Sequence, residues 1–397
     1  MMSTHPELLA EKVVAGGEAL ARGADGRVVL IEGAIPGERV RVELHNVKKT
    51  FARGRILEVL EPSPDRVAPP CPHVAAGCGG CDWQHIAADA QRNLRRDIVV
   101  DALTRLGKVT DAANLVTAAV ALPDEDFRTS VRVLMVKGRP AFRRAYSHDP
   151  VLVDSCLVAH PLIESLIADA KFDAVKEAEI RCGARTGERL VIAFPTTRYL
   201  ELPDDVVTIG ADDLEAGRTA MFAEQAAGRR WRISATSFFQ TRADGADALA
   251  QLVAEAVPDT AETVVDLYAG VGLFAGTIAR PGRTVIAVEG NPAAVRDAKH
   301  NLAADNVKVE RADIGRWDPV PADVVIADPS RAGLGADVIS HIAGTDASRV
   351  VLVACDAAAL GRDVALLGGE GFALTSATPV DLFPHTSHVE VVAVLDR

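Results

Sequence analysis

The sequence predicts an α/β protein, with a doubly wound, mostly parallel C-terminal sheet preceded by an OB-like β-barrel and a mixed α+β central domain. Three observations carry this prediction. The 397-residue length is typical of two to three domains. Short strand-like segments separated by glycines fill residues 11–60. From residue 236 onward, strand-like and helix-like segments alternate regularly.

The N-terminal segment has the pattern of a small barrel. Residues 27–31 form a short apolar strand, and residues 39–44 alternate charged with apolar side chains. Residues 53–59 have the composition of a further strand, and the proline-rich stretch 62–70 indicates a linker. We therefore predict an OB-like barrel over residues 1–66.

The rest of the chain divides where its pattern changes. Residues 67–235 are mixed, with strand-like segments at 131–136 and 190–194, and are assigned to the central domain. Residues 236–397 form the predicted doubly wound domain. Its expected helices are 244–257 and 293–302, and its expected strands are 263–267, 284–288, 307–310, 324–327 and 350–354.

The composition indicates a globular protein of the cytoplasm. Apolar residues make up 48% and charged residues 25% of the chain, the balance of an ordinary soluble domain. Six cysteines are too few for a disulfide-stapled secreted scaffold. Residues 1–14 lack the apolar centre of a secretory signal, and no apolar run approaches the roughly 20 residues that cross a bilayer. We expect cytoplasmic localisation, no membrane association and no obligate protein partner.

The net charge of −12 is unevenly distributed. Residues 236–397 hold 12 Lys and Arg against 22 Asp and Glu, whereas residues 1–66 hold 10 of each. This pattern permits a polyanionic partner and equally fits a solvated surface. The basic clusters are Lys48, Lys49, Arg53 and Arg55; Arg92, Arg95 and Arg96; Arg143 and Arg144; and Arg229, Arg230 and Arg232.

A glycine loop follows the strand at 263–267 and opens a helix. Gly270 and Gly272 allow a sharp turn and let a ligand approach the helix N-terminus without a Cβ in the way. With Ala275, the spacing also satisfies the Gly-x-Gly-x-x-Gly/Ala pattern of nicotinamide dinucleotide sites. Glu289 ends the next strand, where a carboxylate binds the ribose hydroxyls of either cofactor.

Asp266, inside the strand that leads into this loop, favours S-adenosylmethionine. A buried carboxylate is costly unless it is paired. The α-ammonium of S-adenosylmethionine would pair with Asp266, whereas a pyrophosphate would be repelled. Asp313, after the third strand, could accept a hydrogen bond from an adenine amine. We expect a methyl donor at this loop, with a nicotinamide enzyme as the alternative.

Two further strand ends carry reactive side chains. Asp328 ends the fourth strand and Cys355 the fifth, at the carboxyl edge where open α/β sheets bind ligands. A late polar segment, residues 383–390, contains two histidines and ends in Glu390. The Asp-Pro pair at Asp328 also suggests methylation of an exocyclic amine, but Arg331 stands where such enzymes have a stacking ring.

Four of the six cysteines form a three-plus-one pattern. Cys71, Cys78 and Cys81 lie close together in the sequence, and 74 residues separate Cys81 from Cys156. This spacing favours an iron–sulfur cluster held by four thiolates, because a zinc ribbon has two Cys-x2-Cys pairs. Zinc is the alternative. Cys182 fits no pattern and is interpreted as structural.

Over its whole length the chain resembles the RNA uracil-C5 methyltransferase family, in particular its iron–sulfur branch that acts on 23S rRNA. Residues 11–66, with Ile-Pro-Gly-Glu-Arg-Val at 35–40, resemble a TRAM domain, an OB-like RNA-binding barrel. Ser-Phe-Phe-Gln at 237–240 and Phe-Pro-His-Thr-Ser-His-Val-Glu at 383–390 resemble two of the family's site motifs.

The resemblance implies a Rossmann-like class I methyltransferase domain and a role for each matching residue. Cys355 corresponds to the nucleophile that forms an adduct with uracil C6, and Glu390 to the base that removes the C5 proton. The matched S-adenosylmethionine contacts are Gln240, Tyr268, Glu289 and Asp328. The matched [4Fe–4S] ligands are Cys71, Cys78, Cys81 and Cys156. The implied partner is RNA, with 23S rRNA favoured and tRNA as the alternative.

The chain departs from the family pattern beside the nucleophile. Ala354, Asp356 and Ala357 stand where the family has Ser, Asn and Pro, and the glycine loop has Leu273 where Asn is usual. We expect the Asp356 carboxylate to raise the pKa of the Cys355 thiol. Two other classes stay open: a methyltransferase with another target, and an RNA-binding protein with a decayed site.

Overall fold

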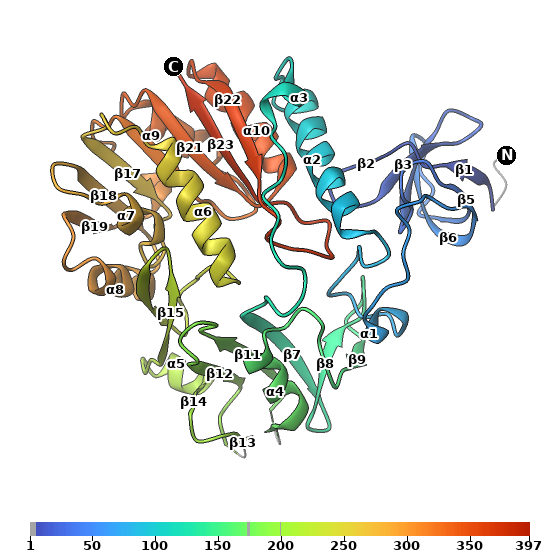
Figure 1. Cartoon of the computed structure of the whole chain (residues 1–397), viewed down its shortest axis with the longest axis horizontal. Helices are drawn as coiled ribbons and strands as arrows, with labels where there is room; N and C mark the ends of the chain where they lie inside the picture. Colours follow the sequence, from blue (N-terminus) through green and yellow to red (C-terminus); the bar gives the residue numbers. More distant parts are fainter. Residues whose placement is uncertain (1–4, 173–174, 199) are drawn as a thin grey trace.

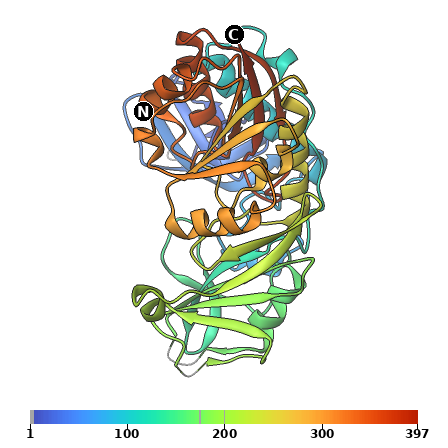
Figure 2. The same ribbon diagram turned by 90° about the vertical axis from the view of Figure 1, so that its left-hand side faces the viewer.

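The computed structural model describes residues 5–172, 175–198 and 200–397. The chain folds into three parts: an N-terminal sheet on one side, a C-terminal domain on the other, and a central domain below both (Figure 1). Figure 2 shows the C-terminal domain above the central domain. Within the described ranges, no helix is long and apolar enough to cross a membrane.

The N-terminal part is a six-stranded, barrel-like sheet, as the sequence predicts. Its core is formed by alternating apolar side chains such as Val29 and Ile31 on one strand and Val40 and Val42 on another, all fully buried. The strands, in spatial order, are β1 (Glu7–Leu9), β5 (Arg39–His45), β6 (Phe51–Glu61), β4 (Val28–Glu32), β3 (Ala19–Arg22) and β2 (Lys12–Val13).

The central part is built on a second six-stranded sheet, covered on one face by α4 (Pro161–Asp169). Its strands, in order, are β14 (Val206–Gly210), β12 (Arg189–Phe194), β11 (Glu177–Cys182), β7 (Ser130–Val136), β8 (Arg139–Arg143) and β9 (Pro150–Leu152). Smaller elements are α1 (Pro72–Ala75), α5 (Ala211–Glu215), the pair β10 (Lys171–Phe172) and β13 (Leu200–Glu201), and the hairpin β15 (Met221–Ala226) and β16 (Arg229–Ser234).

The C-terminal domain confirms the predicted doubly wound, mostly parallel sheet. Five parallel strands come first: β19 (Val307–Arg311), β18 (Thr284–Glu289), β17 (Thr263–Leu267), β20 (Val324–Ala327) and β21 (Arg349–Ala354). Two antiparallel strands, β23 (Val391–Asp396) and β22 (Ala373–Pro379), complete the sheet. Its helices are α6 (Ala243–Ala256), α7 (Leu273–Ile278), α8 (Pro292–Asn301), α9 (Gly335–Ala343) and α10 (Ala357–Gly369), with η1 (Ile314–Arg316) as a short 3-10 turn.

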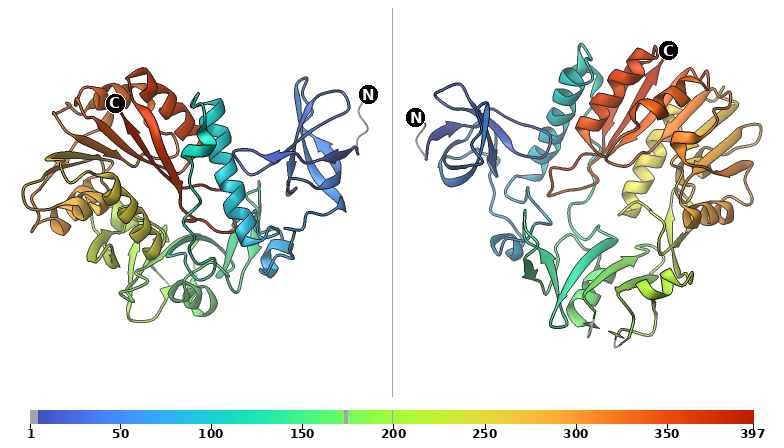
Figure 3. Two further views of the ribbon diagram at one scale, coloured as in Figure 1. Left: turned by 45° about the horizontal axis from the view of Figure 1, so that its top comes forward. Right: turned by 180° about the vertical axis from the view of Figure 1, so that it is seen from behind.

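A long helix from the predicted central segment packs on the C-terminal domain instead. α2 (Ala88–Arg105) and α3 (Ala112–Leu115) share one apolar core with α10 and β22, through side chains such as Ile98 and Leu103. Both views of Figure 3 place α2 between the N-terminal sheet and the C-terminal domain. We expected this segment in the central domain, whereas its apolar side chains pack on the C-terminal domain.

Two of the basic clusters are occupied by internal contacts. Arg95 is buried against Asp381, and Arg96 donates to the backbone carbonyl of Val116 at 3.0 Å. Arg229 pairs with Asp305 at 2.6 Å. These arginines therefore stabilise the fold and do not form an open polycationic face.

Candidate active site and cysteine pocket

The glycine loop after β17 has the backbone conformation that the sequence predicts. Gly270 and Gly272 have positive φ values of 56° and 99°, and Tyr268, at the start of the loop, has a φ of 61°. Gly272 precedes α7, and a Cβ at Gly272 would lie 2.7 Å from the side chain of Leu302. A side chain at this position would therefore be strained by both conformation and space.

Glu289 at the end of β18 holds the glycine loop in place. Its carboxylate accepts hydrogen bonds from the backbone N–H groups of Gly270 at 2.9 Å and of Asn291 at 2.6 Å. Tyr268, Glu289 and Asp313 line one pocket of about 770 Å³ at the carboxyl edge of the sheet. The structure thus brings together three predicted donor-binding residues, of which the first and the last are 45 positions apart in the chain.

Asp266 is fully buried in β17 beside this loop. Its Oδ2 accepts a hydrogen bond from the Ala275 N–H at 2.9 Å, whereas its Oδ1 has no hydrogen-bond partner. Burial, together with the nearby carboxylates of Asp328 and Glu289, raises the pKa of Asp266 to about 8. A buried, half-satisfied carboxyl fits a cationic ligand group at this point.

Gln240 meets Asp328, whose carboxylate acts on both Asp266 and Cys355. The Gln240 side-chain amide donates to Asp328 Oδ2 at 3.4 Å, although the two residues are 88 positions apart. Burial raises the pKa of Asp328 to about 7. Gln240 is itself only 8% exposed, so this polar pair lies away from bulk water.

Strand pairing places Cys355 and Glu390 side by side. β21 and β23 are antiparallel, with Ala354 opposite Val391, so the residue after β21 faces the residue before β23. Glu390 is buried, and Cys355 lines a pocket of about 170 Å³. This pocket is also lined by Arg331, Gly16, Ser387 and His388.

The acid–base state of this pair follows from its surroundings. Burial raises the pKa of the Cys355 thiol to about 11, assisted by the neighbouring Glu390 and Asp328 carboxylates, while Arg331 acts in the opposite direction. Burial and Asp328 also raise the pKa of Glu390 well above its usual range. The ligand-free site therefore holds its protons tightly.

Asp356 has a different role from the one expected. It is the N-cap of α10, and its Oδ1 accepts a hydrogen bond from the Ala359 N–H at 2.7 Å. The carboxylates that raise the pKa of Cys355 are Glu390, which directly precedes β23, and Asp328, which directly follows β20. An aspartate is a favoured N-cap because it satisfies a free N–H of the first helical turn.

The segment that carries Glu390 is held by α2, an arrangement the sequence analysis missed. Arg95 is buried in an ion pair with Asp381 and donates to the Thr386 carbonyl at 2.7 Å. Gln91 accepts from the His385 N–H at 2.8 Å. Trp83 donates its backbone N–H to the His385 carbonyl at 2.9 Å. Residues 381–390, which we call the base loop, are therefore fixed by side-chain and backbone groups of residues 83–95.

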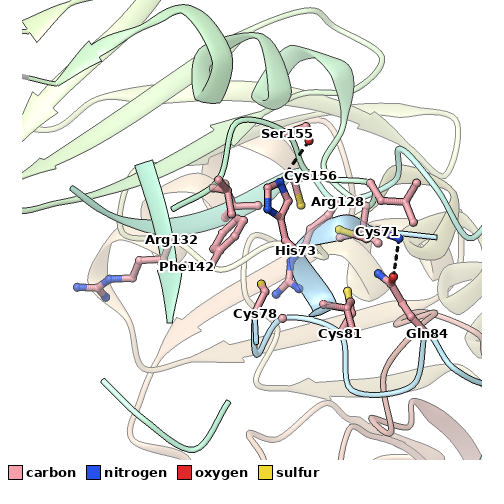
Figure 4. A pocket seen from close by; sticks show the side chains of 16 residues that line it. Cys71, His73, Cys78, Cys81, Gln84, Arg128, Arg132, Phe142, Ser155 and Cys156 are labelled. Atoms are coloured by element: carbon pink, nitrogen blue, oxygen red, sulfur yellow. Dashed lines mark hydrogen bonds between the residues drawn. The ribbon is translucent and has the colours of Figure 1, made fainter. Parts of the chain in front are cut away.

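The four predicted ligand cysteines line a single pocket of about 220 Å³ between α1 and the central sheet. Figure 4 shows the Cys71, Cys78, Cys81 and Cys156 thiols converging on it. Among the residues that the structure describes, no group of three or more His, Cys, Asp or Glu side chains could hold a single metal ion.

Neighbouring backbone fixes the loop that carries Cys78 and Cys81. The Gly79 N–H donates to the Arg143 carbonyl at 2.9 Å, and a Cβ at Gly79 would lie 2.8 Å from the backbone of Ala145. Gly79 is thus required by the adjoining turn. Cys182 lies in the core of the central sheet, apart from this pocket.

The chain is similar to known RNA methyltransferases along nearly its whole length. A family model described as the TRAM domain matches residues 8–57, and one described as the TRM5/TYW2 methyltransferase domain matches residues 223–327. An uncharacterized RNA methyltransferase of Streptomyces coelicolor is 34% identical over 97% of this chain and 91% of its own length. The 23S rRNA (uracil(1939)-C(5))-methyltransferase RlmD of Methylococcus capsulatus is 32% identical over 94% of this chain and 93% of its own.

A solved structure shares the whole fold. The crystal structure of Pyrococcus abyssi tRNA (uracil-54, C5)-methyltransferase in complex with S-adenosyl-L-homocysteine superposes with a TM-score of 0.72 at 22% identity. The match covers 98% of this chain and 99% of that one. Together with the full-length relatives, these matches show that the chain belongs to the S-adenosylmethionine-dependent RNA uracil-C5 methyltransferase family.

Proposed function

We propose that the protein transfers a methyl group from S-adenosylmethionine to C5 of a uridine in RNA, with 23S rRNA as the favoured substrate and tRNA as the alternative. The observation that carries this proposal is the β21–β23 register, which sets the Cys355 thiol beside a buried Glu390. The Asp328 carboxylate acts on both of them and on Asp266 of the donor site. The ribosomal preference rests on the relative of Methylococcus capsulatus named for 23S rRNA.

The reaction needs a covalent activation step, because C5 of uracil is a weak nucleophile. The Cys355 thiolate adds to C6, and the electron pair released from the C5–C6 double bond makes C5 an enolate carbon. C5 then attacks the methyl carbon, and the C–S bond of the sulfonium breaks to leave a neutral thioether. Glu390 removes the C5 proton, the double bond re-forms, and the Cys355 thiolate leaves. A base stacked in RNA cannot enter this pocket, so the uridine is flipped out.

The remaining polar side chains hold the methyl donor. Glu289 and Asp313 line the pocket that would receive its adenosine, with Tyr268 as the apolar wall. Gln240 and Asp328 lie next to it, on the side of the nucleophile. The unpartnered Oδ1 of Asp266 would accept from the donor's ammonium group.

Replacing Asp266 by asparagine tests this donor contact. We expect Asp266→Asn to weaken S-adenosylmethionine binding about 10- to 100-fold, the range for losing a hydrogen bond to a charged group. The ligand-free protein should be no less stable at pH 8. Folding raises the pKa of Asp266 from 3.8 to about 8, so its contribution to stability is lost as the pH rises through that range. Calorimetric titration and thermal unfolding at pH 5 and pH 8 measure both effects, and unchanged donor affinity would refute the contact.

The proton affinities predict a characteristic pH profile. Because the pKa of Cys355 is raised to about 11 and that of Glu390 is also raised, kcat/KM for the free enzyme should rise steadily between pH 6 and pH 9. A bound sulfonium adds positive charge, which lowers both pKa values. The kcat profile at saturating donor should therefore lie at lower pH than the kcat/KM profile. Coincident profiles would contradict this electrostatic account.

We also propose that Cys71, Cys78, Cys81 and Cys156 hold a [4Fe–4S] cluster. Four convergent thiols in one pocket suit such a cluster, whose irons each take one thiolate. The cluster would fix the fold of the central domain, because no step of methyl transfer needs an electron. Anaerobically purified protein should contain about four irons and four sulfides per chain. Cys81→Ser should lose them and Cys182→Ala should keep them, whereas one zinc per chain would overturn the assignment.

The target is tested by methyl transfer to unmodified transcripts of large-subunit rRNA and of tRNA, followed by nucleoside mass spectrometry. We expect 5-methyluridine in the rRNA. If 5-methyluridine appears in tRNA alone, the proposed reaction is correct but the substrate is tRNA and not rRNA. If the protein binds S-adenosylmethionine but forms no 5-methyluridine in either RNA, the proposal that it methylates uracil C5 is wrong.

A further inference from the structure

A groove runs from the nucleophile to the N-terminal sheet. The pocket around Cys355 shares Gly16, Ser387 and His388 with a second pocket of about 470 Å³. That pocket shares Glu18, Glu32 and Tyr146 with a third of about 460 Å³ on the N-terminal sheet. We call this continuous depression the interdomain groove.

The groove is a fixed part of the molecule. The Trp83 indole N–H donates to the Gly17 carbonyl at 3.3 Å, and a Cβ at Gly17 would lie 2.4 Å from Ser387 of the base loop. Lys12 on β2 pairs with Asp101 on α2 at 2.5 Å. The N-terminal sheet is thus docked against the base loop.

Tyr146 presents an unusually open aromatic ring to this groove. Its exposed fraction of 79% is the largest among the described large apolar side chains. The turn that carries it is pinned to the cysteine loop, because the Ala145 N–H donates to the Gly77 carbonyl at 3.2 Å and the Gly79 N–H to the Arg143 carbonyl. Tyr146 has a φ of 56° within this turn. A ring held on a rigid turn is suited to stacking.

The charges around Tyr146 select what can stack there. Glu18, Glu32 and Asp82 line the same pocket as its ring. Arg53 pairs with Glu18 at 3.1 Å, which leaves Glu32 and Asp82 as the described carboxylates of this pocket without an arginine partner. Carboxylates repel a phosphate backbone but accept hydrogen bonds from the amino groups of adenine, cytosine and guanine. Uracil has no amino group and can offer a carboxylate only its ring N3–H, so these acceptors favour an amino-bearing base.

We propose that Tyr146 is a stacking site for an unpaired, amino-bearing RNA base close to the target uridine, with Glu32 and Asp82 as acceptors for its amino group. This inference rests on the proposed function, because it takes RNA as the occupant. The continuity of the groove with the Cys355 pocket supports that occupant, since the strand next to a flipped uridine must leave the pocket along an open path.

Fluorescence anisotropy with labelled 12-nucleotide oligoadenylate and oligouridylate tests the site on the full chain. We expect tighter binding of oligoadenylate, and Tyr146→Ala should weaken it about 5- to 100-fold, the range for a lost base–aromatic stack. Tyr146→Phe keeps the ring and should stay within about twofold of the wild type. Leu366→Ala, an exposed apolar side chain on α10, should change nothing. Glu32→Gln should reduce the preference for adenine over uracil.

The outcomes separate this inference from the proposed function. If Tyr146→Ala binds oligoadenylate as tightly as the wild type and has an unchanged KM for an RNA that the enzyme methylates, the stacking site is refuted. The proposed methyltransferase function is then unaffected. If oligouridylate binds as tightly as oligoadenylate, the selection by carboxylates is refuted. If the wild type forms no 5-methyluridine in rRNA or tRNA, the proposed function fails, whatever the oligonucleotides show.

Discussion

Replacing Cys355 by alanine should lower methyl transfer to RNA by ~10⁴-fold or more, because the proposed reaction begins with addition of the Cys355 thiolate to uracil C6. Donor binding should stay unchanged, since Cys355 lies outside the pocket lined by Tyr268 and Glu289.

Glu390→Gln should stop the reaction one step later. The methylated adduct then accumulates, because the C5 proton has no base to receive it. Denaturing electrophoresis of enzyme with labelled RNA distinguishes the two variants, because only Glu390→Gln should show a covalent enzyme–RNA adduct.

Cys182→Ala is the matched control for the nucleophile. Cys182 is a buried thiol in the central core, and we expect its replacement to cost some stability and to leave the turnover number intact. Substantial methylation by Cys355→Ala would exclude a cysteine adduct and would point to a different target atom, such as an exocyclic amine.

The second large effect is expected at the anchor of the base loop. Arg95 and Asp381 are 3% and 2% exposed, and removing one partner of a buried ion pair costs about 3–5 kcal/mol. Arg92 also pairs with Asp381, at 3.3 Å, so we expect Arg95→Met to destabilise the protein by less than that amount. We also expect it to lower kcat, because the base loop carries Glu390. Arg105→Ala, at an exposed pair on the same helix, should cost less than about 1 kcal/mol.

A double variant separates positioning from stability. Arg95→Met with Asp381→Leu replaces the ion pair by apolar side chains, which restores much of the stability. It does not restore the hydrogen bond from Arg95 to the Thr386 carbonyl. We expect chemical denaturation to show recovery while single-turnover rates stay low. Recovery of the rates together with stability would reduce the Arg95–Asp381 pair to a purely structural role.

The sequence predicted the C-terminal sheet well because its strands are apolar runs flanked by clear breaks. β17 and β20 coincide with their predicted ranges of 263–267 and 324–327. The parallel order then brings the strand ends to one edge, so Tyr268, Glu289 and Asp313 meet in one pocket.

The anchoring of the base loop could not be predicted in the same way. α2 buries Gln91 and Arg95 among its apolar side chains, which weakens the periodicity by which a helix face is recognised. Their partners, His385 and Asp381, lie almost 300 residues later, and no local pattern specifies such a pairing. The role of Asp356 was mistaken for a related reason, since proximity in sequence to Cys355 did not reveal that its carboxylate caps α10.

The most direct test of the covalent mechanism uses RNA that contains 5-fluorouridine at the target position. Fluorine at C5 cannot leave as a cation to Glu390, so the adduct with the enzyme should persist after methyl transfer. Proteolysis and mass spectrometry should find the methylated fluorouridine on the peptide that contains Cys355. An adduct on another residue, or donor consumption without any adduct, would contradict the account.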